Sequence, residues 1–321
     1  MKVIQRSLQD RGDPAKTLGI TLHLSSDRLK VLTTSCSLLL EWASRYVNML
    51  IPGRGIAFYV SVLVTTHTRR RVHSALKALQ KTFSSTKSCF LSFCLVRSNA
   101  TIDKYPINFM RNCALKLSCT ELVALLDVDF VISRSLVEAW LSSDSVESVL
   151  KDFCITSKGV LVLPAFEESM RVEENMQNSP RGGTNGQEED ITTNLSGCLS
   201  DIHSFKTALE CKTNVISSWE KGHVEPFASS IFPEGHRATN FSQWKGSSLA
   251  YNVEYEEGFE PFVIAARVYL PRYDERFEGY GRNKVIYFYH LFRLGFCFRV
   301  HSEWFTLHRA HAPSPAALAT L

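Results

Sequence analysis

Short apolar runs alternate with amphipathic stretches along the first third of the chain. Residues 19–24, 56–65 and 89–96 are rich in β-branched and aromatic side chains, which predicts three strands. Between them, apolar residues recur at helical spacing over residues 29–43 and again over residues 67–81, which predicts two helices. Strand, helix, strand, helix, strand is the order typical of a parallel sheet covered by helices.

The same alternation continues to the end of the chain. Pro106 is well placed at the first position of a helix. The clearest buried strand spans residues 121–130 and ends on polar residues. Further strands are predicted at 159–163, 262–268, 296–300 and 305–308, with helices at 136–141, 200–211 and 283–294. We therefore expect an α/β fold with a central, mostly parallel sheet flanked by helices.

One stretch interrupts this pattern. Residues 167–193 combine many acidic residues with Gly and Pro, which predicts a flexible acidic insertion at the surface. A length of 321 residues suits one large domain or two small ones. We expect an N-terminal arm at 1–17, a single α/β domain at 18–315 that contains the insertion, and a C-terminal tail at 316–321.

Composition and charge exclude some functions. A hydrophobic content of 45% and a charged content of 21% are ordinary for a globular protein with a sizeable core. The net charge of +4 is spread along the chain, which predicts no binding to nucleic acid. No apolar run approaches the ~20 residues that cross a bilayer. Residues 1–16 are charged and have the features of neither a signal peptide nor an anchor.

The nine cysteines show no Cys-x-x-Cys spacing of the zinc or redox kind. The pairs Cys89/Cys94 and Cys113/Cys119 are the closest in sequence, and we interpret them as small buried hydrophobes. Glycosylation sequons begin at Asn99, Asn194 and Asn240, and are weak evidence for a lumenal location.

Two carboxylates, Asp127 and Asp129, stand at the C-terminal end of the predicted strand 121–130. Ligands of open α/β sheets bind just beyond this end of the strands. Two carboxylates there repel each other unless a cation compensates the charge. Oxygen ligands beside a nucleotide diphosphate suit Mn²⁺ or Mg²⁺. The alternative is a capping and turn pair without a metal.

Two further groups of polar residues are candidates for the same site. His308 and His311 follow the last predicted strand, where they are metal ligands or ordinary core and surface histidines. Asn108, Arg111 and Asn112 share one face of the helix that precedes the carboxylate strand. That face is either solvated or in contact with a ligand.

Several motifs, in order along the chain, resemble the LARGE-like glycosyltransferases of family 49. The resemblance covers about residues 18 to 315. It is carried by residues 24–29, 104–112, 125–130, 238–244, 258–262, 273–277, 279–284 and 308–314. It implies a GT-A-type Rossmann-like fold and an inverting, Mn²⁺-dependent transfer from a UDP-sugar to a glycan or glycoprotein acceptor. Glucuronic acid or xylose would be the sugar, and the Golgi lumen the location.

The resemblance also assigns metal ligands. Asp127 and Asp129 would hold the metal and the diphosphate, with Asp127 also binding the donor. One of His308 and His311 would complete the metal shell, and His308 is preferred because it is nearer the strand end.

Other residues would bind the donor or accept a proton. Glu260 and Asp274 are the candidates for the general base that inversion requires. For Glu260, the alternative is a structural ion pair with Arg267 or Arg276. Lys284 would reach a phosphate or a donor carboxylate, or else lie on a helix surface. The remaining donor-binding residues implied are Asn108, Arg111 and Asn112.

Two other functions stay open. An inactive, glycan-binding family member would be expected to lack the metal ligands, all of which are present here. A nucleotidyltransferase also needs carboxylates near a diphosphate, but it would release pyrophosphate rather than UDP.

Overall fold

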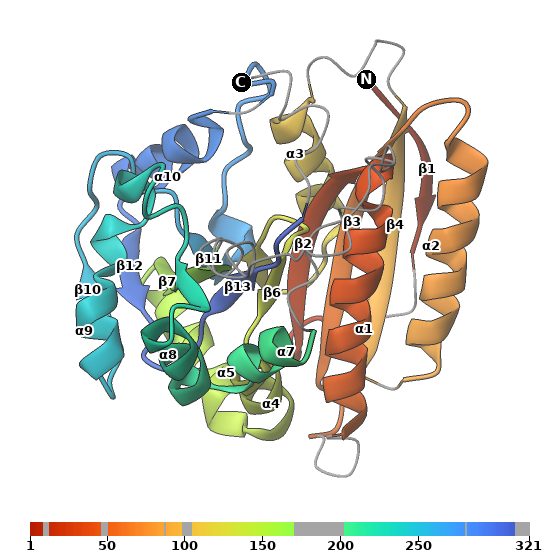
Figure 1. Cartoon of the computed structure of the whole chain (residues 1–321). Coiled ribbons are helices and arrows are strands. Elements are labelled where there is room, and N and C mark those ends of the chain that lie inside the picture. Colours follow the sequence, from red (N-terminus) through yellow and green to blue (C-terminus); the bar gives the residue numbers. More distant parts are fainter. Residues whose placement is uncertain are drawn as a thin grey trace, which may run out of the picture.

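The computed structural model describes residues 1–8, 13–45, 51–86, 88–97, 105–169, 202–279 and 281–311. Within these ranges two sheets form the framework (Figure 1). The larger sheet has nine strands in the order β1-β4-β3-β2-β5-β11-β7-β12-β10, and the smaller has four in the order β6-β13-β8-β9.

The large sheet is mostly parallel. Its strands are β1 (Lys2–Ser7), β2 (Thr17–Ser25), β3 (Gly55–Val64), β4 (Cys89–Arg97), β5 (Leu122–Leu125), β7 (Gly159–Leu163), β10 (Tyr251–Val253), β11 (Phe262–Ala266) and β12 (Cys297–Val300). Strands β2, β3, β4, β5, β7 and β12 run one way, and β1, β10 and β11 run the other. The predicted α/β class with a mostly parallel sheet is confirmed.

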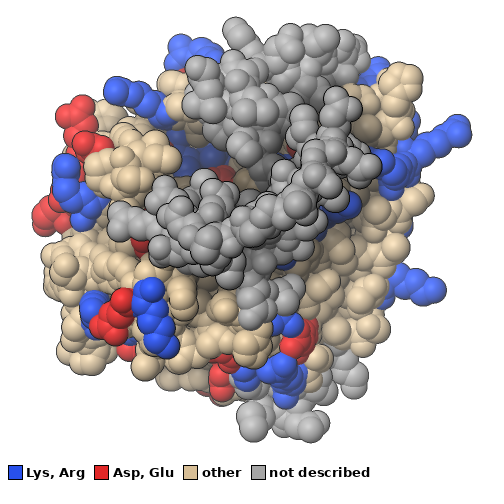
Figure 2. All heavy atoms as spheres, viewed as in Figure 1, with Lys and Arg blue, Asp and Glu red and all other residues tan. Residues whose placement is uncertain are grey.

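Helices flank this sheet (Figure 1). Every residue of β3 is buried, as expected for a strand covered on both faces. The α-helices are α1 (Leu29–Arg45), α2 (Arg69–Ser84), α3 (Ile107–Leu117), α4 (Arg134–Ser142), α5 (Asp144–Lys151), α7 (Ile202–Glu210), α8 (Lys212–Glu220), α9 (Phe241–Gly246) and α10 (Asn283–Arg293). No helix in the described ranges is long and apolar enough to cross a membrane. On the face shown in Figure 2, basic and acidic side chains are interspersed, in keeping with the evenly spread charge.

One predicted strand is divided between the two sheets. The strand expected at residues 121–130 ends at Leu125 as β5, and the chain re-enters a strand only at Phe130, in the small sheet. That sheet consists of β6 (Phe130–Ile132), β8 (Ala165–Glu168), β9 (Val224–Pro226) and β13 (Thr306–His308). The backbone N–H of Phe130 donates to the carbonyl of Asp127 at 3.1 Å and closes a turn. Ionised carboxylates are costly inside a dry sheet, so the turn places them outside it.

The N-terminal segment is partly incorporated in the sheet. Residues 2–7 of the predicted arm form β1, which pairs antiparallel with β4 from Lys2 opposite Arg97 to Ser7 opposite Phe93. At the predicted acidic insertion, Glu167 and Glu168 belong to β8. Residues 170–193 of the insertion and the tail at 316–321 lie outside the described residues.

Phe166 holds the small sheet against the helices. It is fully buried, and its ring centroid lies within 6.0 Å of those of Trp219, Phe241, Trp244 and Phe305. We expect Phe166→Ala to lower the free energy of unfolding by about 3–5 kcal/mol, because it leaves a cavity among these rings. Phe166→Leu should cost less than about 1.5 kcal/mol, because more volume is retained. Urea denaturation measures both, and an Ala variant within about 1 kcal/mol of wild type would contradict this packing.

Candidate active site

The turn between β5 and β6 carries both candidate carboxylates. β5 runs parallel to β2, with Thr21 opposite Leu125, so His23 near the end of β2 lies level with Asp127. β6 pairs antiparallel with β13, with His308 opposite Phe130, which brings His308 beside Asp129. The site therefore forms where the C-terminal ends of parallel strands meet the small sheet.

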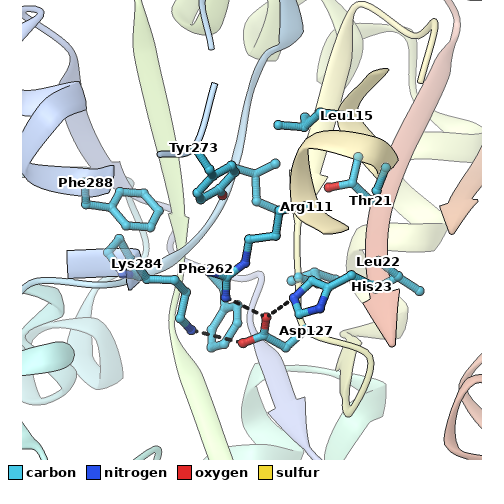
Figure 3. A pocket seen from close by; sticks show the side chains of 14 residues that line it. Thr21, Leu22, His23, Arg111, Leu115, Asp127, Phe262, Tyr273, Lys284 and Phe288 are labelled. Atoms are coloured by element: carbon cyan, nitrogen blue, oxygen red, sulfur yellow. Dashed lines mark hydrogen bonds and ion pairs between the residues drawn. The ribbon is translucent and has the colours of Figure 1, made fainter. Parts of the chain in front are cut away.

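Three basic side chains surround Asp127 (Figure 3). Its Oδ1 accepts from His23 Nε2 at 3.1 Å and from Arg111 at 3.2 Å, and its Oδ2 lies 3.2 Å from the Lys284 ammonium. Burial acts to raise the pKa of the Asp127 carboxyl, but Lys284, Arg111 and His23 outweigh it and hold that pKa well below its ordinary value. Asp127 is therefore an ionised carboxylate.

Each of the three basic residues is fixed by a second contact. Burial lowers the pKa of His23, and its Nδ1 lies 3.1 Å from the Tyr105 hydroxyl, so a neutral His23 donates from Nε2 to Asp127. Arg111 of α3 also donates to Asn283 Oδ1 at 2.5 Å. The Lys284 ammonium lies 4.0 Å from the centre of the Phe262 ring. The space left among these side chains is about 20 Å³, which is about enough for one water molecule.

Asp129 faces a different set of groups. Its Oδ2 lies 2.8 Å from Nε2 of His311 and 3.7 Å from Nε2 of His308. One ligand atom from each of the three residues lies within 4.8 Å of the others, the arrangement of a candidate metal centre. Burial acts to raise the pKa of Asp129, but the nearby His308 and His311 imidazoles outweigh it, and that pKa lies well below its ordinary value.

The chemistry of this cluster fits a divalent cation. Asp129 Oδ1 is buried and has no hydrogen-bond partner among the residues that the structure describes. An acceptor in that position is costly to bury, and a cation would satisfy it. One carboxylate and two imidazoles are ordinary ligands for a transition metal.

A contact with Arg28 determines which ring nitrogen of His311 carries the proton. The guanidinium of Arg28 lies 2.5 Å from His311 Nδ1. Because a guanidinium only donates, Nδ1 is the acceptor and the ring proton lies on Nε2, which donates to Asp129. In this tautomer His311 offers no free nitrogen to a metal, which leaves His308 as the histidine with an available Nε2.

Asp127 is not part of the three-residue cluster. The sequence predicts it as a metal ligand beside Asp129 and as a donor-binding residue, whereas the structure places it among His23, Arg111 and Lys284. Lys284 and Arg111, both predicted to bind the donor, line the same small pocket as Asp127.

The two predicted donor-binding asparagines contact the chain itself. Asn108 and Asn112 are buried on α3, so their helix face is not solvated. Asn108 donates to the carbonyl of Asp274 at 2.8 Å, and Asn112 exchanges two hydrogen bonds of 2.9 Å with the backbone of Tyr273. Both amides therefore hold the segment around residues 273–275 against α3.

The two predicted base candidates differ in their surroundings. Glu260 follows Gly258, whose φ of 91° allows the turn, and the Glu260 carboxylate has no hydrogen-bond or ion-pair partner among the described residues. Burial raises the pKa of the Glu260 carboxyl. The positive charge of Lys284 acts to lower it, and the negative charge of Asp127 acts to raise it.

The Asp274 carboxylate instead lies at the surface, in an ion pair with Arg276. The Arg276 side chain donates to it from Nε at 3.0 Å to each oxygen and from Nη2 at 2.5 Å to Oδ2, and Arg276 holds its pKa to about 2. The expected alternative for Glu260, an ion pair with Arg267 or Arg276, is not formed. Arg267 donates to Ser118 Oγ at 2.9 Å, and Arg276 pairs with Asp274.

Sequence reasoning missed four contributors to the site: His23, Arg28, Asn283 and Phe262. A polar residue near the end of a strand beside the carboxylate strand was the available signal for His23. Arg28 and Asn283 lie 283 and 172 residues from their partners along the chain, which no local pattern reveals.

The family model and the similar curated proteins indicate the same family. A family model described as "Glycosyl-transferase for dystroglycan" matches residues 28–316. The xylosyl- and glucuronyltransferase LARGE2 of Mus musculus is 30% identical over 210 residues, which are 65% of this chain and 25% of that protein. LARGE1 of Homo sapiens is 30% identical over 210 residues, 65% of this chain and 23% of its own. This chain thus spans about a quarter of the length of these curated relatives.

Among solved structures, S. aureus TarS 1–349 is similar with a TM-score of 0.38 and 10% identity, over 90% of this chain and 60% of that one. A complex of TarS 1–349 with UDP has a TM-score of 0.25 and 13% identity, over 54% of this chain and 40% of that one.

The environment of Glu260 predicts an effect on stability. Because the folded-state pKa of Glu260 is raised, ionising it destabilises the fold at neutral pH, and this penalty disappears below the ordinary carboxyl pKa of about 4.5. We expect Glu260→Gln to be at least as stable as wild type at pH 7, with the difference vanishing near pH 4. Denaturant melts at the two pH values measure this. A Gln variant that is less stable at pH 7 would mean that the carboxylate is held by a favourable partner.

Proposed function

This chain belongs to the family described as glycosyl-transferase for dystroglycan, and on that premise we propose that it is a metal-dependent, inverting glycosyltransferase that uses a UDP-sugar. Glucuronic acid or xylose is the proposed sugar, and a hydroxyl of a glycan is the proposed acceptor. The Golgi lumen remains the predicted location. The observation that carries this proposal is that two carboxylates set two residues apart have different partners: Asp129 lies in a metal-type cluster, and Asp127 lies beside two basic side chains.

The metal is proposed to bind at the Asp129 cluster. Asp129 and His308 would hold it, with His311 joining only if Arg28 releases its Nδ1. A nitrogen ligand favours Mn²⁺ over Mg²⁺, which binds oxygen almost exclusively. When bound, the cation would neutralise negative charge that develops on the leaving diphosphate.

The donor is proposed to bind beside Asp127. Arg111 and Lys284 carry two positive charges against the single negative charge of Asp127, so one positive charge is left over for an anion. In the proposed complex, the Lys284 ammonium and the Arg111 guanidinium attract the diphosphate or a sugar carboxylate. Asp127 keeps both side chains pointed into the site.

Glu260 is the proposed general base. Inversion requires that a base remove the proton of the acceptor hydroxyl while its oxygen attacks the anomeric carbon and UDP departs. The Glu260 carboxylate has no competing partner among the described residues, and its raised pKa makes it a stronger base than an ordinary carboxylate. Asp274 is a weaker base, because Arg276 holds its pKa to about 2.

The class of reaction is tested by UDP release across a panel of UDP-sugars, with Mn²⁺ or with a chelator. We expect metal-dependent release from one donor, and about a 100-fold or larger loss in Asp129→Asn, because several kcal/mol of charge stabilisation are removed. Asp152→Asn, at an exposed position with no part in the site, is the matched control and should keep full activity.

The other outcomes discriminate between the alternatives. Release of pyrophosphate instead of UDP would identify a nucleotidyltransferase. Failure to bind either UDP or Mn²⁺ would overturn the enzyme proposal and favour an inactive, glycan-binding protein.

The base is tested by comparing Glu260→Gln with Asp274→Asn. We expect kcat of the Glu260 variant to fall by about 10²–10⁴-fold, the usual contribution of general base catalysis, while the Asp274 variant changes little. In the wild type, activity should rise as the pH passes the pKa of Glu260, which lies above the ordinary 4.5, because only the carboxylate accepts a proton. Near-normal turnover in Glu260→Gln would exclude this role.

A further inference from the structure

Two cysteines that are distant in sequence belong to one apolar cluster between a strand and a helix. Cys94 belongs to β4 and Cys113 to α3, and both belong to one apolar cluster together with Val96 and Met110. The two thiols interact, because each shifts the pKa of the other in the opposite direction. The sequence pairs Cys89/Cys94 and Cys113/Cys119 are therefore not the spatial ones.

The two cysteines differ in exposure. Both cysteines line a cavity of about 830 Å³. Cys94 is 2% exposed, whereas Cys113 is half-buried and faces the cavity. The cavity also has basic walls, formed by Arg6 of β1, Lys116 of α3, and Arg267 and Arg272 of the segment that follows β11, with Glu275 as its acidic member.

We propose that Cys94 and Cys113 form a redox-sensitive disulfide that joins β4 to α3. This site is distinct from the proposed transfer chemistry, because neither cysteine is among the residues proposed above to hold the metal, bind the donor or act as the base. The proposal rests on the shared apolar cluster, the shared cavity and the greater exposure of Cys113.

The environment assigns a different role to each sulfur. The Cys94 thiol lowers the pKa of Cys113, Arg6 and Lys116 lower it further, and burial and Glu275 act to raise it. The same contact, with burial, raises the pKa of Cys94. Cys113 is thus the thiolate that attacks first, and Cys94 is the resolving thiol.

The oxidant that the cavity suits is a small anionic disulfide such as glutathione disulfide. The Cys113 thiolate attacks one of its sulfurs, forms a mixed disulfide and releases one glutathione thiolate. Cys94 then loses its proton and attacks the Cys113 sulfur, which forms the protein disulfide and releases the second glutathione. Two protein thiols are oxidised, and one glutathione disulfide is reduced to two thiols.

Other thiols of the described chain provide internal comparisons. Cys119 lines the same cavity, but it contacts the Tyr59 hydroxyl at 3.1 Å rather than another thiol. Cys89 and Cys154 are enclosed in the core, where burial raises their pKa values to about 11 and about 12. These thiols should stay reduced when the Cys94–Cys113 bond forms.

The test is disulfide mapping of the full chain. The protein is equilibrated with glutathione disulfide, its free thiols are blocked with N-ethylmaleimide, and peptides are analysed by mass spectrometry without reduction. We expect a Cys94–Cys113 cross-link that dithiothreitol removes, and a melting temperature on the order of 5 °C higher in the oxidised protein. Cys119→Ser is the matched control and should form the same cross-link.

A trapping variant tests the order of steps. Cys94→Ser should stop at Cys113 carrying one glutathione, whereas Cys113→Ser should leave Cys94 free. Alkylation of both cysteines in the oxidised wild type would overturn the proposal, as would linkage of Cys113 to Cys119. The wild-type map decides even if a variant folds poorly, and it does not depend on transferase activity.

Discussion

The active site depends on the repulsion between two ionised carboxylates set two residues apart. Asp127 and Asp129 are both buried enough that neither remains charged without compensation. The turn at Val128 separates their environments, so that Asp127 receives three basic partners and Asp129 receives two histidines. One oxygen of Asp129 has no hydrogen-bond partner within the described part of the chain, which makes that half of the turn the proposed place for a cation.

The strand pairings of the two sheets bring these partners to the two carboxylates. The parallel pairing of β2 with β5 brings His23 to Asp127, and the antiparallel pairing of β13 with β6 brings His308 to Asp129. Helices α3 and α10 contribute Arg111 and Lys284. Because these elements come from all parts of the chain, the site assembles only when the whole fold does.

Much of this fold can be predicted from the sequence, because strands covered on both faces are continuous apolar runs and helices show one apolar face. β7 and α10 begin at their predicted residues. The features that could not be predicted depend on pairing between segments that are far apart in the chain. The strand expected over residues 121–130 is split because its two ends pair with different sheets, and β11 enters antiparallel between β5 and β7 from far along the chain.

The candidate residues show the same limit. Spacing indicated that Asn108, Arg111 and Asn112 share a face, but only the structure shows that the two amides hold residues 273–275 while Arg111 reaches Asp127. Likewise, sequence alone could not separate Glu260 from Asp274, because their difference lies in whether Arg276 is within reach.

The division of the two carboxylates is tested most directly by Mn²⁺ binding, measured by electron paramagnetic resonance on the wild type, Asp127→Asn and Asp129→Asn. We predict that Asp129→Asn weakens binding by about 100-fold or more, since it removes a ligand. Asp127→Asn should weaken it by less than about tenfold, since it removes only a neighbouring charge. Equal losses in the two variants, or wild-type affinity in Asp129→Asn, would contradict the account.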